Sequence, residues 1–316
     1  MTTSDFLKQW NDVEPTITAH TSGSTGTPKE IRLSKADMEL SARATLDFLG
    51  LSGRRGLNFV MPLSADYIAG KMMIVRALLA DARLWELTPS NNPLHDFDAD
   101  VDIDLLPVVP SQLPALLDDP RLGRVKCLIV GGAPMSPEVE TRLARCRVNA
   151  FATYGMTETC SHVAMRRVGE PLYRAMPGIT FETVDDDRLV IVNPRATYRR
   201  LETNDVVDLV SPTSFVWLGR ADNVINSGGF KLYPEEIERA IAPVMGAREY
   251  YVTSRPSRLW GSEAVLMVEG ALSLHERGQI AAGMRSLLSS RQVPKDIIAV
   301  ANFTRTASGK IKRVKA

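Results

Sequence analysis

Residues 21–29 (TSGSTGTPK) are the part of this sequence that most limits what the chain can fold into. The segment has two glycines, five hydroxyl side chains and one lysine, so it is a poor candidate for a buried core. Glycine lets successive backbone N–H groups point toward one ligand, and such turns form concave sites for phosphate. The hydroxyls add donors, and Lys29 adds a positive charge. The segment therefore favours an anion-binding loop, although its order differs from the Walker pattern and, by itself, also fits a linker.

Regular structure is predicted on both sides of this loop. Residues 16–20 and 30–33 alternate as β-strands do, so the loop is expected to lie between two strands. Ser34 stands where a helix N-cap is expected, and the apolar spacing that follows predicts a helix that ends at Gly50.

Two later strands are expected to end at a shared ligand site. Residues 127–130 (CLIV) form an apolar run typical of a strand buried on both faces, and GGAP (131–134) follows. Residues 149–153 predict another strand, which leads into YGMTET (154–159). Ligands bind at the carboxyl ends of strands in parallel α/β sheets, so the segments after these two strands are expected to converge.

The residue types of YGMTET suit a nucleotide and its metal ion. Tyr154 offers a ring for base stacking, and Thr157 offers a hydroxyl group. Glu158 provides the kind of oxygen ligand that Mg²⁺ takes. The alternative is a polar turn in which the threonine and the glutamate cap a helix.

The second half of the chain has short alternating segments, which predict antiparallel β structure from about residue 171. TND (203–205) is expected just before one strand and GRAD (219–222) just after another. An aspartate and an arginine at strand ends could bind a ribose and a phosphate. Residues 226–232 are expected to turn into a strand, and Pro234 is expected to begin a helix.

Three basic residues have separate interpretations. A predicted apolar helix, residues 67–79, carries Lys71 and Arg76. We interpret Lys71 as a surface charge, whereas Arg76 has apolar neighbours on both sides and is a candidate for contact with an acidic ligand. Lys310 in the tail follows a glycine and could reach a developing negative charge; the alternative is a solvated basic terminus.

Composition and charge narrow the class of protein. The 316 residues suggest two domains, or one large and one small, and the 44% hydrophobic content is enough to bury a core. The net charge of +1 gives no support for nucleic acid or a membrane as a main partner. There is no apolar run of membrane-helix length and no secretion signal, so we expect a cytoplasmic protein. Three widely spaced cysteines suggest neither a disulfide framework nor a metal site.

Together these segments resemble those of the adenylate-forming superfamily, which includes acyl- and aryl-CoA synthetases, luciferases and the adenylation domains of peptide synthetases. Within it, the sequence is most similar to the short o-succinylbenzoate–CoA ligases of menaquinone biosynthesis. The matches run in order along nearly the whole chain: TSGSTGTPK (21–29), GGAP (131–134), YGMTET (154–159), TND (203–205), GRADNVINSGGFKLYPEEIE (219–238) and TASGKIKR (306–313).

The resemblance implies an α/β fold and two half-reactions. A large N-terminal domain (1–221) would have a mostly parallel sheet flanked by helices, with a β-rich subdomain, and a small mobile α+β domain (222–316) would follow. In the first half-reaction a carboxylate attacks the α-phosphate of ATP, which gives an acyl-adenylate and pyrophosphate. In the second, the thiol of CoA displaces AMP. ATP, Mg²⁺ and CoA are the implied cofactors, and a carboxylic acid is the implied substrate.

The resemblance also implies roles for individual residues. Lys310 would bridge carboxylate and phosphate, Thr157 would contact the α-phosphate, and Glu158 would ligate Mg²⁺. Asp222 would be the hinge about which the small domain turns. The other implied positions are Thr21, Ser22, Gly23, Ser24, Thr25, Gly26, Thr27 and Lys29 for the β- and γ-phosphates; Gly132, Ala133, Pro134 and Tyr154 around the adenine, with Gly155 and Met156 beside them; Asp205 and Arg220 for the ribose; and Gly228 and Gly229 along the pantetheine channel.

Two residues are candidates for the acid-binding pocket. Arg76 would provide a cation for the second carboxylate of o-succinylbenzoate, and Tyr67 stands where relatives often have an aromatic residue or histidine. The phosphate loop comes early in this chain, which implies a reduced N-terminal subdomain and leaves a homodimer open. The alternatives for function are a ligase for another aryl or acyl acid, an enzyme that loads a carrier protein, and a non-catalytic nucleotide-binding protein.

Overall fold

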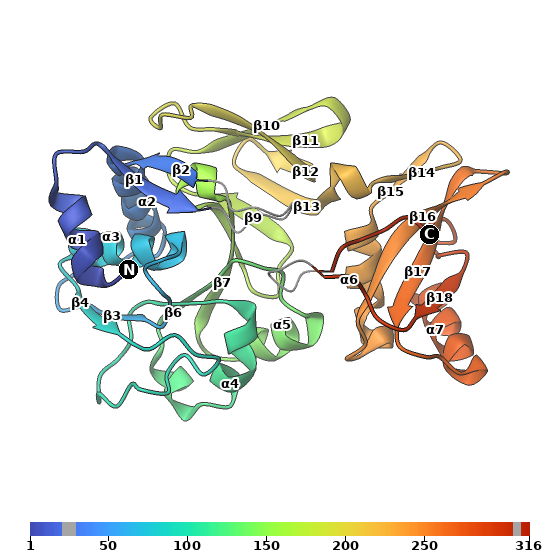
Figure 1. Cartoon of the computed structure of the whole chain (residues 1–316), viewed down its shortest axis with the longest axis horizontal. Coiled ribbons are helices and arrows are strands. Elements are labelled where there is room, and N and C mark those ends of the chain that lie inside the picture. The colour runs from blue at the N-terminus through green and yellow to red at the C-terminus, as the bar shows by residue number, and fades with distance from the viewer. Residues whose placement is uncertain (21–29, 306–310) are drawn as a thin grey trace.

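A large lobe and a small lobe make up the structure, a computed structural model that describes residues 1–20, 30–305 and 311–316 (Figure 1). The large lobe extends to the 3₁₀ turn η5 (Ala221–Asn223), and the following residues form the small lobe beside it. The expected α/β class, with a large sheet and flanking helices, is confirmed.

The elements of the large lobe lie close to most of their predicted positions. Its helices are α1 (Thr3–Asn11), α2 (Lys35–Phe48), α3 (Ile68–Ala80), α4 (Leu113–Leu117) and α5 (Pro137–Ala144), and its other 3₁₀ turns are η1 (Pro110–Gln112), η2 (Pro120–Arg124), η3 (Thr157–Thr159) and η4 (Asp185–Asp187). Its strands are β1 (Thr16–His20), β2 (Glu30–Ser34), β3 (Asn58–Met61), β4 (Arg83–Glu86), β5 (Leu106–Val108), β6 (Cys127–Val130), β7 (Asn149–Gly155), β8 (His162–Arg167), β9 (Leu172–Ala175), β10 (Thr180–Val184), β11 (Arg188–Val192), β12 (Arg200–Ser211) and β13 (Ser214–Arg220).

Within the described part of the chain, one sheet of nine strands is the frame of the large lobe, in the order β10-β11-β12-β13-β9-β8-β7-β6-β5. Strands β5, β6 and β7 are parallel, and each neighbouring pair from β7 to β10 is antiparallel. A parallel bridge between Phe59 and Leu105 brings the parallel pair β3–β4 alongside β5. The parallel and β-rich regions, which the sequence suggests are separate, therefore share one sheet.

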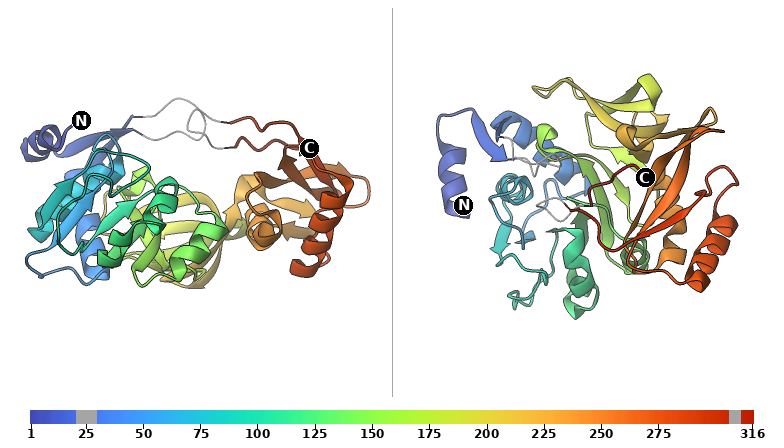
Figure 2. Two further views of the ribbon diagram at one scale, coloured as in Figure 1. Left: turned by 90° about the horizontal axis from the view of Figure 1, so that it is seen from below. Right: turned by 45° about the vertical axis from the view of Figure 1, so that its right-hand side comes forward.

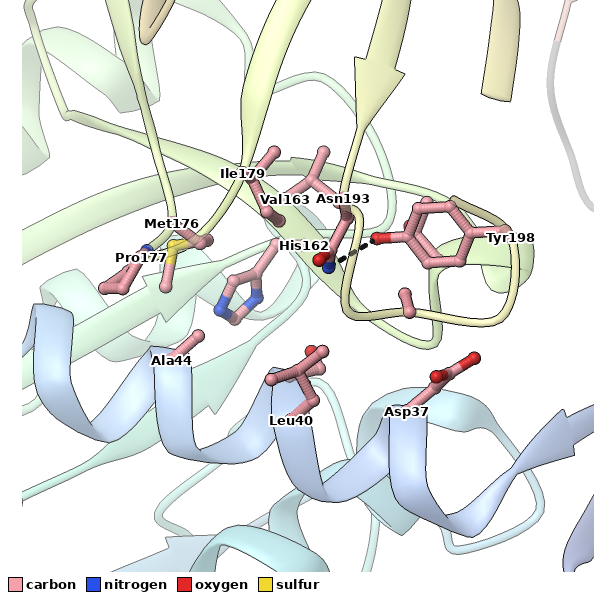
Figure 3. Close-up of a pocket in the computed structure, with 13 residues that line it drawn as sticks. Asp37, Leu40, Ala44, His162, Val163, Met176, Pro177, Ile179, Asn193 and Tyr198 are labelled. Atoms are coloured by element: carbon pink, nitrogen blue, oxygen red, sulfur yellow. Dashed lines mark hydrogen bonds between the residues drawn. The ribbon is translucent and has the colours of Figure 1, made fainter. Parts of the chain in front are cut away.

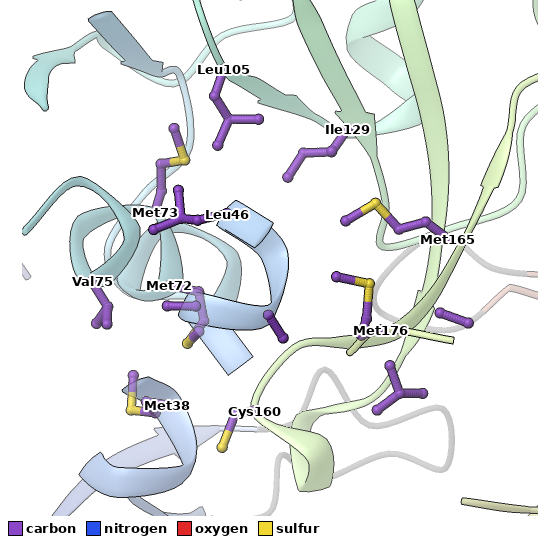
Figure 4. Packing of buried hydrophobic residues seen from close by; sticks show 14 of the residues in the cluster. Met38, Leu46, Met72, Met73, Val75, Leu105, Ile129, Cys160, Met165 and Met176 are labelled. Atoms are coloured by element: carbon purple, nitrogen blue, oxygen red, sulfur yellow. The ribbon is translucent and has the colours of Figure 1, made fainter. Parts of the chain in front are cut away.

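Both faces of the parallel part of the sheet are buried. Along β6, Ile129 packs in the cluster that includes α2 and α3, whereas Leu128 and Val130 pack in the cluster that includes α4 and α5. Side chains alternate between the faces of a strand, so the apolar run is explained by helices on both sides. Methionines fill much of the first cluster, in which Met38 of α2 and Met72 of α3 are buried (Figure 4). Their flexible side chains suit irregular gaps between helices and sheet.

The small lobe is an α+β unit. Its sheet has the order β15-β14-β17-β16, with β18 parallel to β17, and α6 and α7 pack against it. Its elements are β14 (Ile225–Ser227), β15 (Phe230–Leu232), α6 (Pro234–Met245), β16 (Tyr250–Ser257), β17 (Gly261–Glu269), α7 (Leu274–Leu287) and β18 (Ile297–Val300). The expected domain boundary between residues 221 and 222 lies inside η5 and stays a prediction.

Some predicted local structure is wrong. Strand β8 is missed because its first four residues are all buried and do not alternate. TND lies inside β12, which begins at Arg200, and not before a strand. Polar residues are accommodated there because Thr203 Oγ1 donates to the Leu189 carbonyl at 2.9 Å and accepts from the Asp205 amide at 3.1 Å. Gly219 and Arg220 likewise belong to β13 and do not follow it.

The interpretation of Lys71 as a surface charge is also wrong. Lys71 is buried, and its Nζ donates to the carbonyls of Ala65 at 2.8 Å and Asp66 at 3.1 Å. Burial lowers the pKa of this amine, and the negative charge of Asp66 acts in the opposite direction. Lys71 therefore ties the turn before α3 to the helix. By contrast, Ser34 caps α2 as predicted, with its Oγ accepting from the Asp37 amide at 3.3 Å.

No helix in the described ranges is both long and apolar enough to cross a bilayer.

Gly70 in α3 is expected to tolerate no side chain. A Cβ at Gly70 would lie 2.3 Å from the Ser64 carbonyl oxygen, so Gly70→Ala should lower the free energy of unfolding by about 1–3 kcal/mol. Gly278 in α7 is the matched control, since nothing lies within 4 Å of its added Cβ. Gly278→Ala should raise stability by up to about 1 kcal/mol. Urea unfolding of both variants checks this, and equal effects would contradict the close approach at Gly70.

Candidate functional site

The carboxylate of Asp205 is the centre of a polar cluster. Asp205 lies in β12 and is 6% exposed. Its Oδ2 accepts a hydrogen bond from the Tyr154 hydroxyl at 2.7 Å, and its Oδ1 accepts from Trp217 Nε1 at 3.2 Å and Arg220 Nη1 at 3.4 Å. Arg220 of β13 stands directly opposite Asp205 in the strand register. The two residues predicted to bind a ribose are therefore in contact.

Tyr154 reaches this cluster from the other half of the sheet. Three strands separate β7 from β12 in the sheet order, so the sheet must curve for the Tyr154 hydroxyl to meet Asp205. The Tyr154 ring makes edge contacts with Phe215 and Tyr173, at centroid distances of 5.2 and 5.9 Å. Burial, followed by the charge of Asp205, raises the pKa of Tyr154, so its hydroxyl remains a donor. Tyr154 and Gly155 lie inside β7, so this strand continues two residues beyond its predicted end at residue 153.

The ends of β6 and β7 lie side by side, as the sequence predicts. Val130 and Ala152 are register partners in the parallel pair, and Thr153 Oγ1 donates to the Val130 carbonyl at 3.1 Å. A Cβ on Gly131 would lie 2.5 Å from Thr153 Oγ1, so glycine permits this close approach. The predicted adenine-flanking residues that follow β6 are all exposed: Gly132, Ala133 and Pro134.

The segment after β7 leaves two side chains available for a ligand. Thr159 Oγ1 lies 2.9 Å from the Met156 carbonyl oxygen and 2.7 Å from the Ser161 carbonyl oxygen, and its single proton, donated to these acceptors, helps to fix the turn η3. Thr157 is half-buried and Glu158 is exposed, and neither side chain has a partner among the residues that the structure describes. An exposed, unpaired carboxylate is suited to bind a hard cation such as Mg²⁺.

A buried chain of hydrogen bonds connects α2 and α3 to the start of β8. Arg76 Nη2 donates to Ser161 Oγ at 2.7 Å, and Ser161 Oγ lies 3.2 Å from His162 Nδ1. His162 Nε2 lies 2.9 Å from Thr45 Oγ1, which itself donates to the carbonyl of Ser41 at 3.0 Å. Thr45 must therefore accept from Nε2–H, and Ser161 must donate to Nδ1. This order of donors selects the neutral Nε2–H tautomer of His162.

Sequence analysis gave Ser161 and His162 no role. Ser161 lies in the bend just before the unpredicted strand β8, and His162 is the first residue of that strand. Burial and the charge of Arg76 lower the pKa of His162 well below 6.5. Arg76 is only 2% exposed, and burial lowers its pKa to about 10, so it stays charged at neutral pH. Its Nε has no hydrogen-bond partner, and its guanidinium no ion pair, within the described ranges. Among the described residues, Arg76 is thus a buried cation without a counter-ion.

The two predicted acid-binding residues do not converge. Tyr67 is the N-cap of α3 and 65% exposed, whereas Arg76 lies nine positions further along and is buried. Nine residues are two and a half helical turns, so the two side chains leave opposite faces about 13 Å apart along the axis. Tyr67 and Arg76 cannot both line one small pocket in this structure unless the acid spans that distance.

A small cavity beside His162 lies between α2 and the antiparallel strands, with Asp37, Asn193 and Tyr198 in its wall (Figure 3). Its volume of about 10 Å³ is enough for one water molecule and far too small for an acid or a nucleotide. Ser41 Oγ, which also lines it, is buried without a partner in the described chain. A water molecule would satisfy Ser41, so we interpret the cavity as structural.

Two predicted segments, the phosphate loop (21–29) and Lys310, lie outside the described residues. Strands β1 and β2, which flank residues 21–29, pair with each other. Next to the second, Arg305 pairs with Ile311 across an antiparallel bridge, and Arg305 Nη2 lies 2.8 Å from Glu269 Oε2. The residues on both sides of 306–310 extend from the small lobe toward the large lobe (Figure 2).

Gly228 and Gly229 form the turn between β14 and β15, with φ values of +56° and +83°. A Cβ on Gly228 would lie 2.6 Å from Trp260 Cε3, and the Gly228 amide donates to the Trp260 carbonyl at 2.9 Å. Both the positive φ and the indole ring exclude a larger residue at position 228. Asp222, the predicted hinge, lies in η5, where its carboxylate accepts from Asn204 Nδ2.

Comparison with known proteins identifies the family of this chain. A family model described as "AMP-binding enzyme" matches residues 8–197. The solved structure of an acyl-CoA synthetase (AMP-forming)/AMP-acid ligase II-like protein from Dyadobacter fermentans is 32% identical to this chain, with 98% of this chain and 91% of that chain covered and a TM-score of 0.67.

Two further proteins have names that match the resemblance. The 2-succinylbenzoate–CoA ligase of Oceanobacillus iheyensis is 24% identical over 93% of this chain and 68% of its own length. The o-succinylbenzoate-CoA synthetase of Bacillus subtilis, solved with its acyl-adenylate intermediate, is 19% identical, with 93% of this chain and 67% of that chain covered and a TM-score of 0.76. At 19% identity, the similarity to the Bacillus subtilis structure shows a common fold.

His162 should make stability depend on pH. The unfolded chain has a histidine pKa of about 6.5, whereas the folded pKa is well below this value. As the pH falls below about 6.5, the unfolded chain binds a proton that the folded protein does not, so the free energy of unfolding falls by up to about 1.4 kcal/mol per pH unit. In His162→Gln this part of the slope should disappear between pH 7 and 5, measured by urea unfolding. His275→Gln, at an exposed site in α7, is the control; an unchanged slope in both would contradict the assignment.

Proposed function

The chain belongs to the family of AMP-binding enzymes, and from this premise we propose that it is an AMP-forming acid–CoA ligase. The observation that carries the proposal is the meeting of Asp205, Arg220 and Tyr154 beside the ends of β6 and β7. A buried carboxylate held by three donors suits a hydroxyl of a ribose, because a carboxylate has about four acceptor sites and can accept one further hydrogen bond. The exposed segment after β6 and the available Thr157 and Glu158 follow the neighbouring ends of β6 and β7.

The residues present fit a nucleotide with Mg²⁺. No group of three or more His, Cys, Asp or Glu that could hold a metal occurs among the described residues, so phosphate oxygens of ATP would have to join Glu158 as ligands. When bound, the ion supplies positive charge to the phosphates. Asp205 and Arg220 would orient the ribose, and Thr157 would donate to the α-phosphate. The loop 21–29 would hold the β- and γ-phosphates.

In this proposal a carboxylate oxygen of the acid bonds to the α-phosphorus of ATP as the bond to pyrophosphate breaks. Such a displacement depends on in-line positioning and on neutralisation of charge more than on an acid or base. Lys310 would lie between carboxylate and phosphate during this step. The CoA sulfur then bonds to the acyl carbon and AMP leaves, with Gly228 and Gly229 along the pantetheine path.

o-Succinylbenzoate is the substrate that we propose. The named ligases for this acid among the relatives support it, as does Arg76, a buried cation that needs an anion. A second aryl or acyl acid, or a carrier protein as acceptor, would use the same residues. The intact Asp205 cluster argues against a non-catalytic relic. A cytoplasmic location, a homodimer and the absence of nucleic acid as a partner stay predictions.

Pyrophosphate release with ATP and Mg²⁺ over a panel of acids tests the function. We expect release with o-succinylbenzoate and, once CoA is added, its thioester as the product. Release with another acid would keep the chemistry and change the substrate. Lys310→Ala is the control: it should abolish release while leaving transfer from a supplied acyl-adenylate to CoA largely intact. No release with any acid from folded, ATP-binding protein would contradict the proposal.

Arg76 should determine the preference for a dicarboxylate. Arg76→Met keeps the volume but removes the charge, so the KM for o-succinylbenzoate should rise at least tenfold, as expected when a charged hydrogen bond is lost, and the KM for benzoate less than threefold. Lys71→Met, which removes the other buried cation of α3, should leave the ratio unchanged. Equal losses for both acids would show that Arg76 acts only by holding Ser161.

A further inference from the structure

Glu235, at the first turn of α6, has a buried carboxylate whose two oxygens have different surroundings. Its side chain is 10% exposed. Oε1 accepts a hydrogen bond from Asn223 Nδ2 in η5 and lies 3.9 Å from Arg313 Nη2. Oε2 is buried and has no hydrogen-bond partner in the described chain. A buried charged oxygen without a donor is unfavourable, because water satisfies the same oxygen when it is exposed.

This unsatisfied oxygen lies where the two lobes meet. An added Cβ at Gly219, in β13 of the large lobe, would be 2.4 Å from Glu235 Oε2, so the carboxylate packs directly on the Gly219 backbone. Other contacts between the lobes are favourable. Lys231 Nζ lies 2.7 Å from Asp186 Oδ1, and Arg239 Nη2 donates to the Trp217 carbonyl at 3.5 Å. Oε2 of Glu235 therefore makes an unfavourable contact within an otherwise favourable interface.

The proposed function requires more than one arrangement of the lobes. Gly228 contacts Trp260, next to the first residue of β17, whereas Arg305 contacts Glu269, the last residue of β17. These positions are separated by eight strand steps, about 26 Å. The turn at 228–229 and the segment next to Lys310 are thus at opposite ends of the small lobe. They cannot both serve one site without a change in orientation.

We infer that Glu235 is a positioning residue that destabilises the lobe orientation seen here and so permits the small lobe to turn for the CoA step. The inference rests on the proposed function. When Glu235 separates from Gly219, Oε2 becomes accessible to water and the unfavourable burial ends. Asn223 sits in the connecting turn and holds Oε1, so the carboxylate stays near the junction in this orientation.

Glu235→Gln should lock the orientation seen here. The amide oxygen can still accept from Asn223, and the buried negative charge is gone. In single-turnover experiments on the full chain, pyrophosphate release should change less than twofold, while transfer from the acyl-adenylate to CoA should slow about tenfold. Glu236→Gln removes the same charge from the neighbouring position of α6, where the side chain makes no hydrogen bond or ion pair with a described residue, and should leave both rates unchanged. Equal slowing of both steps by Glu235→Gln would overturn the inference.

Gly219→Ala should act in the opposite direction. Its methyl group would clash with Glu235 Oε2, so this orientation becomes less populated and pyrophosphate release should slow. Adding Glu235→Ala removes the clash, and the double variant should recover release. If pyrophosphate release does not recover in the double variant, Gly219→Ala acts through the neighbouring Arg220. That result would count against a role for the contact between Gly219 and Glu235.

A distance measured between the two lobes reports their relative orientation and does not depend on the reaction. Spin labels on Val13→Cys in the large lobe and Leu274→Cys in α7 occupy exposed sites, in a chain with Cys146→Ser. Glu235→Gln should narrow the distance distribution, and Gly219→Ala should broaden it. Unchanged distributions would overturn the inference even if the ligase reaction is confirmed. Conversely, an enzyme inactive on every acid would refute the proposed function while these distances still decide the role of Glu235.

Discussion

The buried carboxylate of Asp205 holds together parts of the large lobe that the chain places far apart. Its three donors come from β7 and β13, and the contact to Tyr154 spans three intervening strands. An aspartate this deeply buried is tolerable only with such donors, because an unpaired charge in the interior is strongly unfavourable. The burial of Asp205 therefore depends on three features together: the curvature of the sheet, the position of the Tyr154 ring and the direction of Arg220. A ligand that binds there meets a site already formed by the fold.

Much of this arrangement is predictable from the sequence, for a physical reason. Parallel strands place their carboxyl ends at one edge, so the apolar run at 127–130 and the strand from 149 predicted neighbouring loops. The family resemblance assigned Asp205 and Arg220 to the same ribose, and they face each other in the strand register, although they were expected at strand ends and lie inside β12 and β13. What the residues do there is still inferred from the family, since local pattern identifies a site better than it identifies a role.

The residues that sequence reasoning missed depend on tertiary contacts. The sequence around Lys71 suggests an exposed lysine. Its burial is possible because residues 65 and 66 approach it and supply carbonyl groups that accept its hydrogen bonds. Ser161 and His162 become notable only because α2 and α3 deliver Thr45 and Arg76 to them. No local spacing contains this information. Tyr67 and Arg76 show the opposite effect: they are close in sequence, but helical geometry sends their side chains to different faces, and their roles at an acid pocket stay predictions.

Buried charges in this chain fall into two kinds, and the difference bears on function. Glu238 and Arg313 form an ion pair at 2.6 Å, which fixes the C-terminal tail on α6. Burial raises the pKa of Glu238, and the positive charge of Arg313 acts in the opposite direction. Arg76 and Glu235 instead keep buried polar atoms that no described residue satisfies. Native proteins leave few such atoms. One stands at the proposed acid pocket, where the anion of a bound acid would satisfy Arg76. The other stands at the lobe junction, where the inferred turn of the small lobe would expose Glu235 Oε2 to water. Neither the acid nor the water can be a permanent part of the fold, so both atoms are unsatisfied in the arrangement seen here.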